Sequence, residues 1–318
     1  MPRGSGQSGD LQATYIARIF QLCPGIRALI SMSNANDFSP CKTILYHAPR
    51  SLRHLILYRN SVQSIFEYNT GAMFPGIEIL SLRQSRITLG LETLEVPTLP
   101  DLIELNLVQI VFQSSRDLEI LVQRVRASAE KLKTVRFLDM EVTNIWDSTA
   151  LVRVPTPCED LCLIDFHPFS DSLSTRTSSL HGVRHLTLGV LSPLWKPLTD
   201  WDLPDTLETL TLFVEIPQLR DHLAPEVFRM SVIHMSWIYQ CLRRNIAAHP
   251  SRDSNQLRSV TMNLTGAHSA NTVQNAILQE SMAELRDLCL ANKVSLVERE
   301  LDVETWATAH LSRHLTNN

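Results

Sequence analysis

The sequence predicts an α/β solenoid, in which short parallel strands are stacked one repeat unit after another. Three observations favour it. The pattern apolar-x-x-apolar-x-apolar recurs about every 25 residues along most of the chain. Leucine supplies 47 of the 318 residues, whereas glycine supplies only 10. A unit of this size cannot bury its own apolar face, so units stack and share one continuous core.

Each copy of the pattern contains a short alternating run, which indicates a half-buried strand. The copies begin at Leu52, Ile77, Leu102, Leu132, Cys158, Val183, Leu207 and Leu257, with a degenerate first copy at Ile26. Successive starts lie 24 to 30 residues apart, except for a last gap of 50 residues that spans two periods. The repeat therefore predicts about nine strands, which are parallel because every unit progresses in the same way.

Some segments between the strands have helical spacing. Leu118–Ala129 follows a cap residue at Ser114 or Ser115, and Leu11–Leu22 ends at Cys23-Pro24-Gly25. Further helices are expected over Thr43–His47, Glu226–Ala248 and Asn271–Ala291, and the last of them precedes a strand-like run, Val294–Glu300.

The organisation that follows has three parts. Residues 1–10 form a flexible N-terminal tail, and residues 306–318 form a C-terminal tail. Residues 11–305 form a single solenoid, and a helical insert around residues 225–249 fills the double-period gap.

Composition limits the kinds of partner that the chain is expected to bind and the cellular compartments in which it is expected to lie. A formal net charge of −4 argues against nucleic acid as the main partner, because phosphate binding needs a basic face. No window approaches 18 consecutive apolar residues, so no membrane span is expected. The N-terminal residues lack the apolar stretch of a secretory signal, which predicts a cytoplasmic or nuclear protein whose six cysteines are ordinary thiols.

No motif in the sequence predicts a catalytic, cofactor or metal site. Gly4-x-Gly6-x-x-Gly9 formally matches a dinucleotide fingerprint, but no strand precedes it. His181 and His185 flank a strand entrance, where their spacing does not bring the two rings together. We therefore expect a protein that is not an enzyme. Two alternatives stay open: an enzyme with a site near the non-repeat insert 216–253, and a truncated product without retained activity.

One copy of the repeat resembles a known consensus. Leu52-Arg53-His54-Leu55-Ile56-Leu57-Tyr58-Arg59-Asn60 is similar to the leucine-rich repeat, although the other copies replace the asparagine. This resemblance implies an irregular horseshoe, with the strands on its concave side and helices or loops on its convex side.

Residues 23–26 (Cys-Pro-Gly-Ile) and 74–77 (Phe-Pro-Gly-Ile) open their units in a style that resembles divergent fungal F-box-type leucine-rich-repeat proteins. That resemblance implies substrate recognition for a ubiquitin ligase. It covers the repeat region alone, since no F-box module is seen, so a Skp1-type adaptor is expected only if an F-box lies outside this chain.

The concave face is the expected site of a protein partner. The strand residues that follow the two buried positions form a column rich in aromatic, aliphatic and arginine side chains, which protein interfaces favour. The expected binding residues are Tyr58, Arg83, Leu138, Ile164 and Phe213 from this column, together with Arg136 from the column between the two buried positions. The alternative is that return loops cover this column and that its residues stabilise the fold.

Overall fold

The computed structural model describes residues 6–33, 47–59, 76–87, 98–144, 158–166, 180, 182–190, 203–215, 239–244, 257–265, 272–302 and 305–310. The chain divides into two compact units. Unit 1 comprises Met1–Pro155 and Phe166–Pro168, and unit 2 comprises Thr156–Asp165 and Phe169–Asn318.

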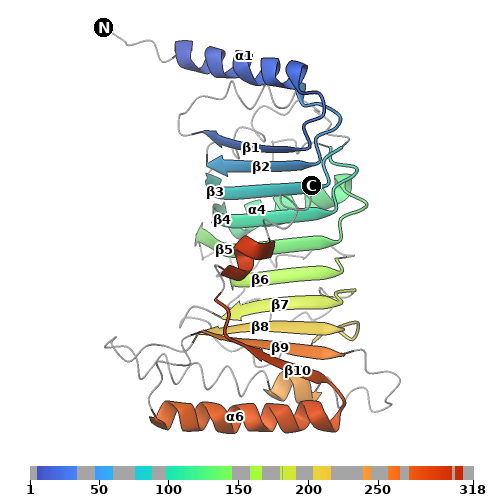
Figure 1. Cartoon of the computed structure of the whole chain (residues 1–318), viewed down its shortest axis with the longest axis vertical. Coiled ribbons are helices and arrows are strands. Elements are labelled where there is room, and N and C mark those ends of the chain that lie inside the picture. Colours follow the sequence, from blue (N-terminus) through green and yellow to red (C-terminus); the bar gives the residue numbers. More distant parts are fainter. Residues whose placement is uncertain are drawn as a thin grey trace. The chain divides into compact units, whose positions relative to one another are not determined.

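Unit 1 contains five parallel strands that are paired in chain order. They are β1 (Ala28–Ser33), β2 (His54–Arg59), β3 (Ile79–Ile87), β4 (Glu104–Ser114) and β5 (Thr134–Asn144). Helix α1 (Gly6–Leu22) precedes β1, and helix α4 (Ser115–Ser128) joins β4 to β5 (Figure 1). The strand arrows of this unit all point the same way in Figure 1.

Unit 2 repeats the arrangement with five further parallel strands in chain order. They are β6 (Asp160–Phe166), β7 (His185–Val190), β8 (Thr209–Glu215), β9 (Ser259–Thr265) and β10 (Ser295–Arg299). Helix α6 (Thr272–Ala291) connects β9 to β10. The α/β solenoid is thereby confirmed, with ten strands rather than about nine, because the run Val294–Glu300 forms β10.

Two inward columns of apolar side chains make the core, and the repeat register predicted them correctly. The eight residues of the first column are between 0% and 3% exposed. They are Leu55, Leu80, Leu105 and Val135 in unit 1, and Leu161, Leu186, Leu210 and Val260 in unit 2. Because the side chains of a strand alternate between faces, the residues on either side of these positions lie on the opposite face, here called the outer face.

A left-handed residue interrupts the alternation at the same register position of four strands. Arg59, Gln84, Gln109 and Asp139 have φ between 50° and 55°, a region that residues other than glycine seldom adopt. The left-handed residue adds one position to the alternation, so the residue that follows it points inward. Ser85, Ile110 and Met140 lie at this position and are buried. The hydroxyl of Ser85 donates to the carbonyl oxygen of Arg59 at 2.9 Å. In unit 1 these inward positions are the ones where the leucine-rich-repeat consensus carries asparagine.

Backbone hydrogen bonds link the strand entrances of neighbouring repeats. The carbonyl oxygen of Arg53 accepts bonds from the amides of both Glu78 and Ile79, at 2.8 and 3.0 Å. The same double acceptance recurs at the carbonyls of Arg27, Glu78, Ile103, Glu159, Arg184 and Glu208. Each carbonyl fixes the next strand in register without using a side chain.

The described helices agree in part with the sequence-based expectations. Helix α4 is capped by Ser114, whose hydroxyl accepts from the Asp117 amide while the Asp117 carboxylate accepts from the Ser114 amide. Helix α6 starts within one residue of its expected start and buries Cys289, and this burial raises the pKa of the thiol to about 11.

Two described helical segments lie partly within the terminal segments of the chain. Helix α1 begins at Gly6, inside the segment expected to be a flexible tail. Residues 305–310 are helical, and Trp306 among them is buried.

Some expectations fall largely outside the described residues. Of the expected insert helix, the structure describes residues 239–244, which are helical, and of Thr43–His47 it describes His47 alone. Among the described helices, none combines the length and the apolar character that a bilayer span requires.

Candidate functional site

The outer face of unit 1 carries an arginine that is held by its neighbours. Arg83 on β3 donates through Nη1 to the hydroxyl of Tyr58 on β2 at 3.1 Å, and through Nε to Ser81 Oγ at 3.0 Å. Its guanidinium carbon lies 5.7 Å from the centroid of the Tyr58 ring, within cation–π range. Tyr58 and Arg83 are both half-buried. The guanidinium is therefore oriented by two neighbouring side chains, and Arg83 as a residue remains partly exposed.

A buried polar cluster occupies β4 and β5 on the same face. Arg136 forms an ion pair with Glu104 and donates through Nη1 to Asn106 Oδ1 at 3.2 Å. Asn106 Nδ2 donates in turn to Glu104 Oε1 at 2.8 Å. The Arg136 and Glu104 side chains are only 10% and 7% exposed. This cluster, Glu104–Asn106–Arg136, neutralises its own charge inside the protein.

That cluster corrects the role expected for Arg136. The sequence register placed Arg136 at an exposed edge, where its charge would meet a partner. In the structure the residue is buried and its guanidinium is engaged by Glu104 and Asn106. Leu138, which follows it on β5, is also buried, at 4% exposure.

The two expected binding residues of unit 2 are buried as well. Ile164 is 1% exposed and leans over Gly189, since a Cβ built on that glycine would lie 2.7 Å from Ile164 Cγ2. Phe213 is fully buried, and the Trp306 ring packs against it edge to face, with ring centroids 5.5 Å apart. The expectation that Phe213 is an exposed aromatic anchor is therefore wrong for this structure. Of the six expected residues, Tyr58 and Arg83 are the two that stay partly accessible.

The strand entrances of unit 1 form a second polar surface. A shallow groove lies at this edge. It is lined by Arg50, Arg53, Glu78, Asp101, Ile103 and Lys131. Arg53 pairs with Glu78 at 3.2 Å, and Lys131 pairs with Asp101 at 2.6 Å. The hydrogen bond to Asp101 raises the pKa of the Lys131 ammonium group.

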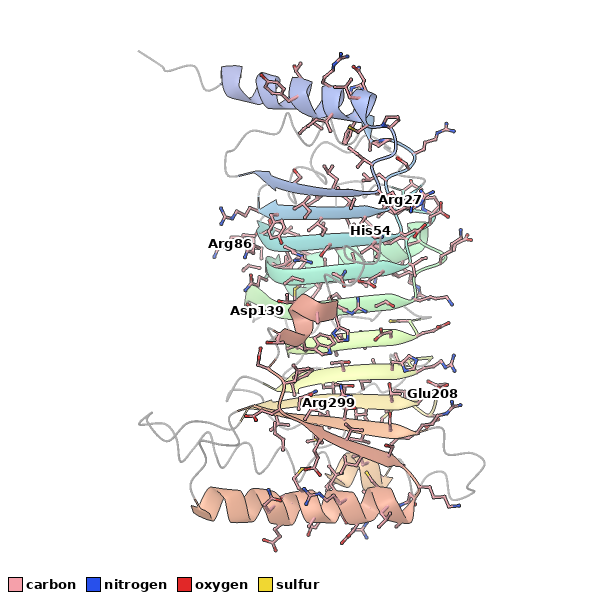
Figure 2. All side chains as sticks on the ribbon, in the orientation of Figure 1. Arg27, His54, Arg86, Asp139, Glu208 and Arg299 are labelled. Atoms are coloured by element: carbon pink, nitrogen blue, oxygen red, sulfur yellow. The ribbon has the colours of Figure 1, made fainter. Side chains whose placement is uncertain are left out.

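Oppositely charged neighbours recur at the strand entrances of both units. In Figure 2, Arg27 lies at the edge where the strands of unit 1 begin, whereas Arg86 and Asp139 lie where they end. Unit 2 has the pair Arg184–Glu208 at its own strand entrances, and the hydrogen bond from Arg184 lowers the pKa of the Glu208 carboxyl group. These exposed pairs contribute little to stability individually. They place opposite charges side by side at the strand entrances named here.

Several other residues considered in the sequence have ordinary structural roles. His185 Nδ1 lies 2.8 Å from Thr209 Oγ1 on the neighbouring strand. Cys158 and Cys162 are buried and form no disulfide bond, and the Cys158 thiol donates to the carbonyl oxygen of Asp160 at 3.1 Å. Glu298 lies on strand β10 and accepts two hydrogen bonds from the Arg286 guanidinium of α6, at 2.6 and 2.7 Å. No group of three or more potential metal ligands occurs within the described part of the chain.

Sequence reasoning missed Glu104, Asn106 and Trp306. The repeat register did make Glu104 and Asn106 strand neighbours of Thr134 and Arg136, and that adjacency was the available signal. It carried no information on burial, which depends on distant parts of the chain. Trp306 lies beyond the last repeat and has no periodic neighbour that would predict its contact.

Comparisons with known proteins add no relative to this description. No model of a known protein family matches the chain, and no curated protein sequence matches it.

Proposed function

We propose that this chain is a non-enzymatic protein-binding solenoid that acts in the cytoplasm or the nucleus. The observation that carries the proposal is the contact between Tyr58 and Arg83 on the outer face of unit 1. An arginine that is held by a tyrosine hydroxyl and a serine hydroxyl loses side-chain conformational entropy, because a long side chain is ordered. On a solvated surface this loss is unfavourable. In an interface the same order is an advantage, since it lowers the entropy lost on binding.

The chemistry of the pair selects the partner. Guanidinium groups engage carboxylates through two parallel hydrogen bonds, and the tyrosine ring offers apolar area beside them. Tyrosine and arginine are also enriched among the residues that dominate binding energy. The partner is therefore a protein segment that presents an aspartate or glutamate next to an apolar side chain.

Replacing Tyr58 and Arg83 together with alanine is expected to weaken partner capture at least about 10-fold, because the anchoring arginine and its aromatic neighbour are lost. The melting temperature should move by less than about 4 °C, since both side chains are half-buried and lie outside the leucine core. The measurement is quantitative affinity purification followed by binding of the recovered partner to each variant.

Arg86→Ala is the matched control. Arg86 is an exposed arginine on the same strand, at the edge where the strands end (Figure 2). Its replacement should leave capture unchanged. Equal loss with the control, or capture that is indifferent to the double change, would count against this surface.

The resemblance noted in the sequence supports a narrower proposal, in which the solenoid recognises substrates for a ubiquitin ligase. A full-length gene product that carries an F-box should then co-purify with a Skp1-type adaptor at near-equal amounts. Recovery of partners without the adaptor would remove the ligase role and leave the binding role standing.

A further inference from the structure

The groove at the strand entrances of unit 1 has a surplus of positive charge. Its charged lining consists of three cations and two carboxylates, namely Arg50, Arg53, Lys131, Glu78 and Asp101. Glu78 is already paired with Arg53, at 3.2 Å. Asp101 is likewise paired with Lys131, at 2.6 Å. Arg50 forms no ion pair within the described part of the chain, so its positive charge is left over and favours an anionic group in the groove.

Arg53 is held in place by the fold on one side of its guanidinium. Its Nη1 donates to the carbonyl oxygens of Arg50 and Gly76, at 3.0 and 3.1 Å, and its Nε faces Glu78. The guanidinium lies close over Gly76, because a Cβ built on that glycine would collide with Nη1. Among the described residues, neither Nη2 of Arg53 nor the guanidinium of Arg50 has a hydrogen-bond acceptor. Two arginines of one groove therefore keep donors that a carboxylate can engage.

An exposed aliphatic side chain lines the same groove. Ile103 is 40% exposed. It occupies the same backbone position as Arg53 two repeats further on, since the carbonyl oxygen of each accepts two amides from the next repeat. Strand β3 lies between the two repeats, and neighbouring strands are about 4.8 Å apart, so the two positions are separated by about 10 Å. The groove thus offers carboxylate-binding donors and an apolar contact at a defined separation.

We propose that this groove binds an extended acidic segment of a partner protein, in which a glutamate or aspartate precedes a leucine by three positions. The carboxylate of the segment is held by Arg50 and by Nη2 of Arg53, and the leucine packs against Ile103. The spacing follows from the geometry, because an extended chain advances about 3.3 Å per residue and three residues span about 10 Å. Recognition of acidic motifs by arginine clusters is an established mode of peptide binding.

The test is a titration of the full-length chain into a fluorescein-labelled peptide, Gly-Ser-Glu-Ala-Ala-Leu-Ser-Gly, followed by fluorescence anisotropy. Binding should be saturable, with a Kd below about 1 mM. Replacing the glutamate of the peptide with glutamine should weaken binding at least about 10-fold, because the charge-assisted bonds are lost. A peptide of the same composition with glutamate and leucine adjacent should bind at least about 5-fold more weakly, since its two side chains cannot span about 10 Å.

Two variants of the protein separate the two contacts. Arg50→Ala should weaken binding at least about 5-fold, and it keeps the backbone carbonyl that Arg53 uses. Ile103→Ser should weaken binding of the leucine peptide about 5-fold. It should leave unchanged the binding of a peptide that carries alanine in place of leucine, because that peptide makes no contact with Ile103.

Arg27→Ala is the matched control. Arg27 is an exposed arginine at the same edge of the strands, in the backbone position equivalent to Arg53 one repeat earlier, and it does not line the groove (Figure 2). At 0.15 M salt its replacement should change binding less than about 2-fold, because charges are screened over about 8 Å.

Several results would overturn the proposal. They are the absence of saturable binding up to about 1 mM protein, and equal losses for Arg50→Ala and Arg27→Ala. Equal affinity for the spaced and the adjacent peptide would refute the stated spacing. Binding of a peptide with phosphoserine in place of glutamate, without binding of the glutamate peptide, would refute the carboxylate chemistry.

This inference rests on the proposed function in one respect, since it takes the ligand to be a segment of a protein. The groove shares no residue with the Tyr58–Arg83 pair, and the peptide assay requires no natural partner. Failure of the Tyr58 and Arg83 prediction and failure of peptide binding in the groove are therefore separate results.

Discussion

Replacing Leu105 with alanine is expected to lower the free energy of unfolding by about 2–5 kcal/mol. Leu105 is 0% exposed and lies between Leu80 and Val135 in the inward column of unit 1. The change removes buried methyl groups and leaves a cavity that the flanking strands cannot close without losing register. Urea denaturation followed by circular dichroism measures the loss.

Ile103→Ala is the control for this change. Ile103 comes just before β4 and is 40% exposed, so removing a similar number of methyl groups there should cost less than about 1 kcal/mol. If the two changes destabilised the chain equally, the inward column would not be the core of the unit.

Replacing Arg136 with alanine is expected to cost about 3–5 kcal/mol, because it leaves the buried Glu104 carboxylate without its cation. The double change Glu104→Leu with Arg136→Met should recover most of that loss, since it removes both charges and keeps apolar volume. Denaturation of the unaltered chain, of the single variants Glu104→Leu and Arg136→Met, and of the double variant forms a complete double-mutant cycle.

The expected result of the cycle is that the double change costs several kcal/mol less than the sum of the two single losses. Additive losses would mean that Glu104 and Arg136 do not depend on each other. They would then contradict the assignment of Glu104–Asn106–Arg136 as one self-neutralised cluster.

The strands and their register could be predicted because they follow from local alternation and a repeated spacing. Leu55, Leu80 and Leu105 recur at the same position of each unit, and a parallel sheet converts that spacing directly into adjacency. Even the tenth strand had a local signal, because residues 294–300 read as a strand without matching the full repeat.

The outer face could not be predicted in the same way, since its exposure depends on segments far away in the sequence. Phe213 has the pattern of an accessible aromatic residue, and nothing near it indicates that Trp306 packs against it. Arg136 has the pattern of a surface arginine, yet Glu104 and Asn106 bury it in a polar cluster. Local pattern thus gave the position of each side chain on its strand, whereas nonlocal packing decided whether solvent reaches it.

The carbonyl groups at the strand entrances each accept two backbone hydrogen bonds, and this affects how the sequence of such a chain can change in evolution. The carbonyls of Arg27, Arg53 and Glu78 accept in the same way as that of Ile103, although their side chains range from cation to anion to hydrocarbon. The amides of Arg53, Glu78 and Ile103 donate in the same set of bonds, so selection at these three positions has only to keep the backbone N–H and carbonyl available. That requirement excludes proline, which lacks the N–H, and admits nearly every other residue. Two descendants of one ancestral chain can therefore retain this scaffold while sharing little more than the spacing of their buried aliphatic residues.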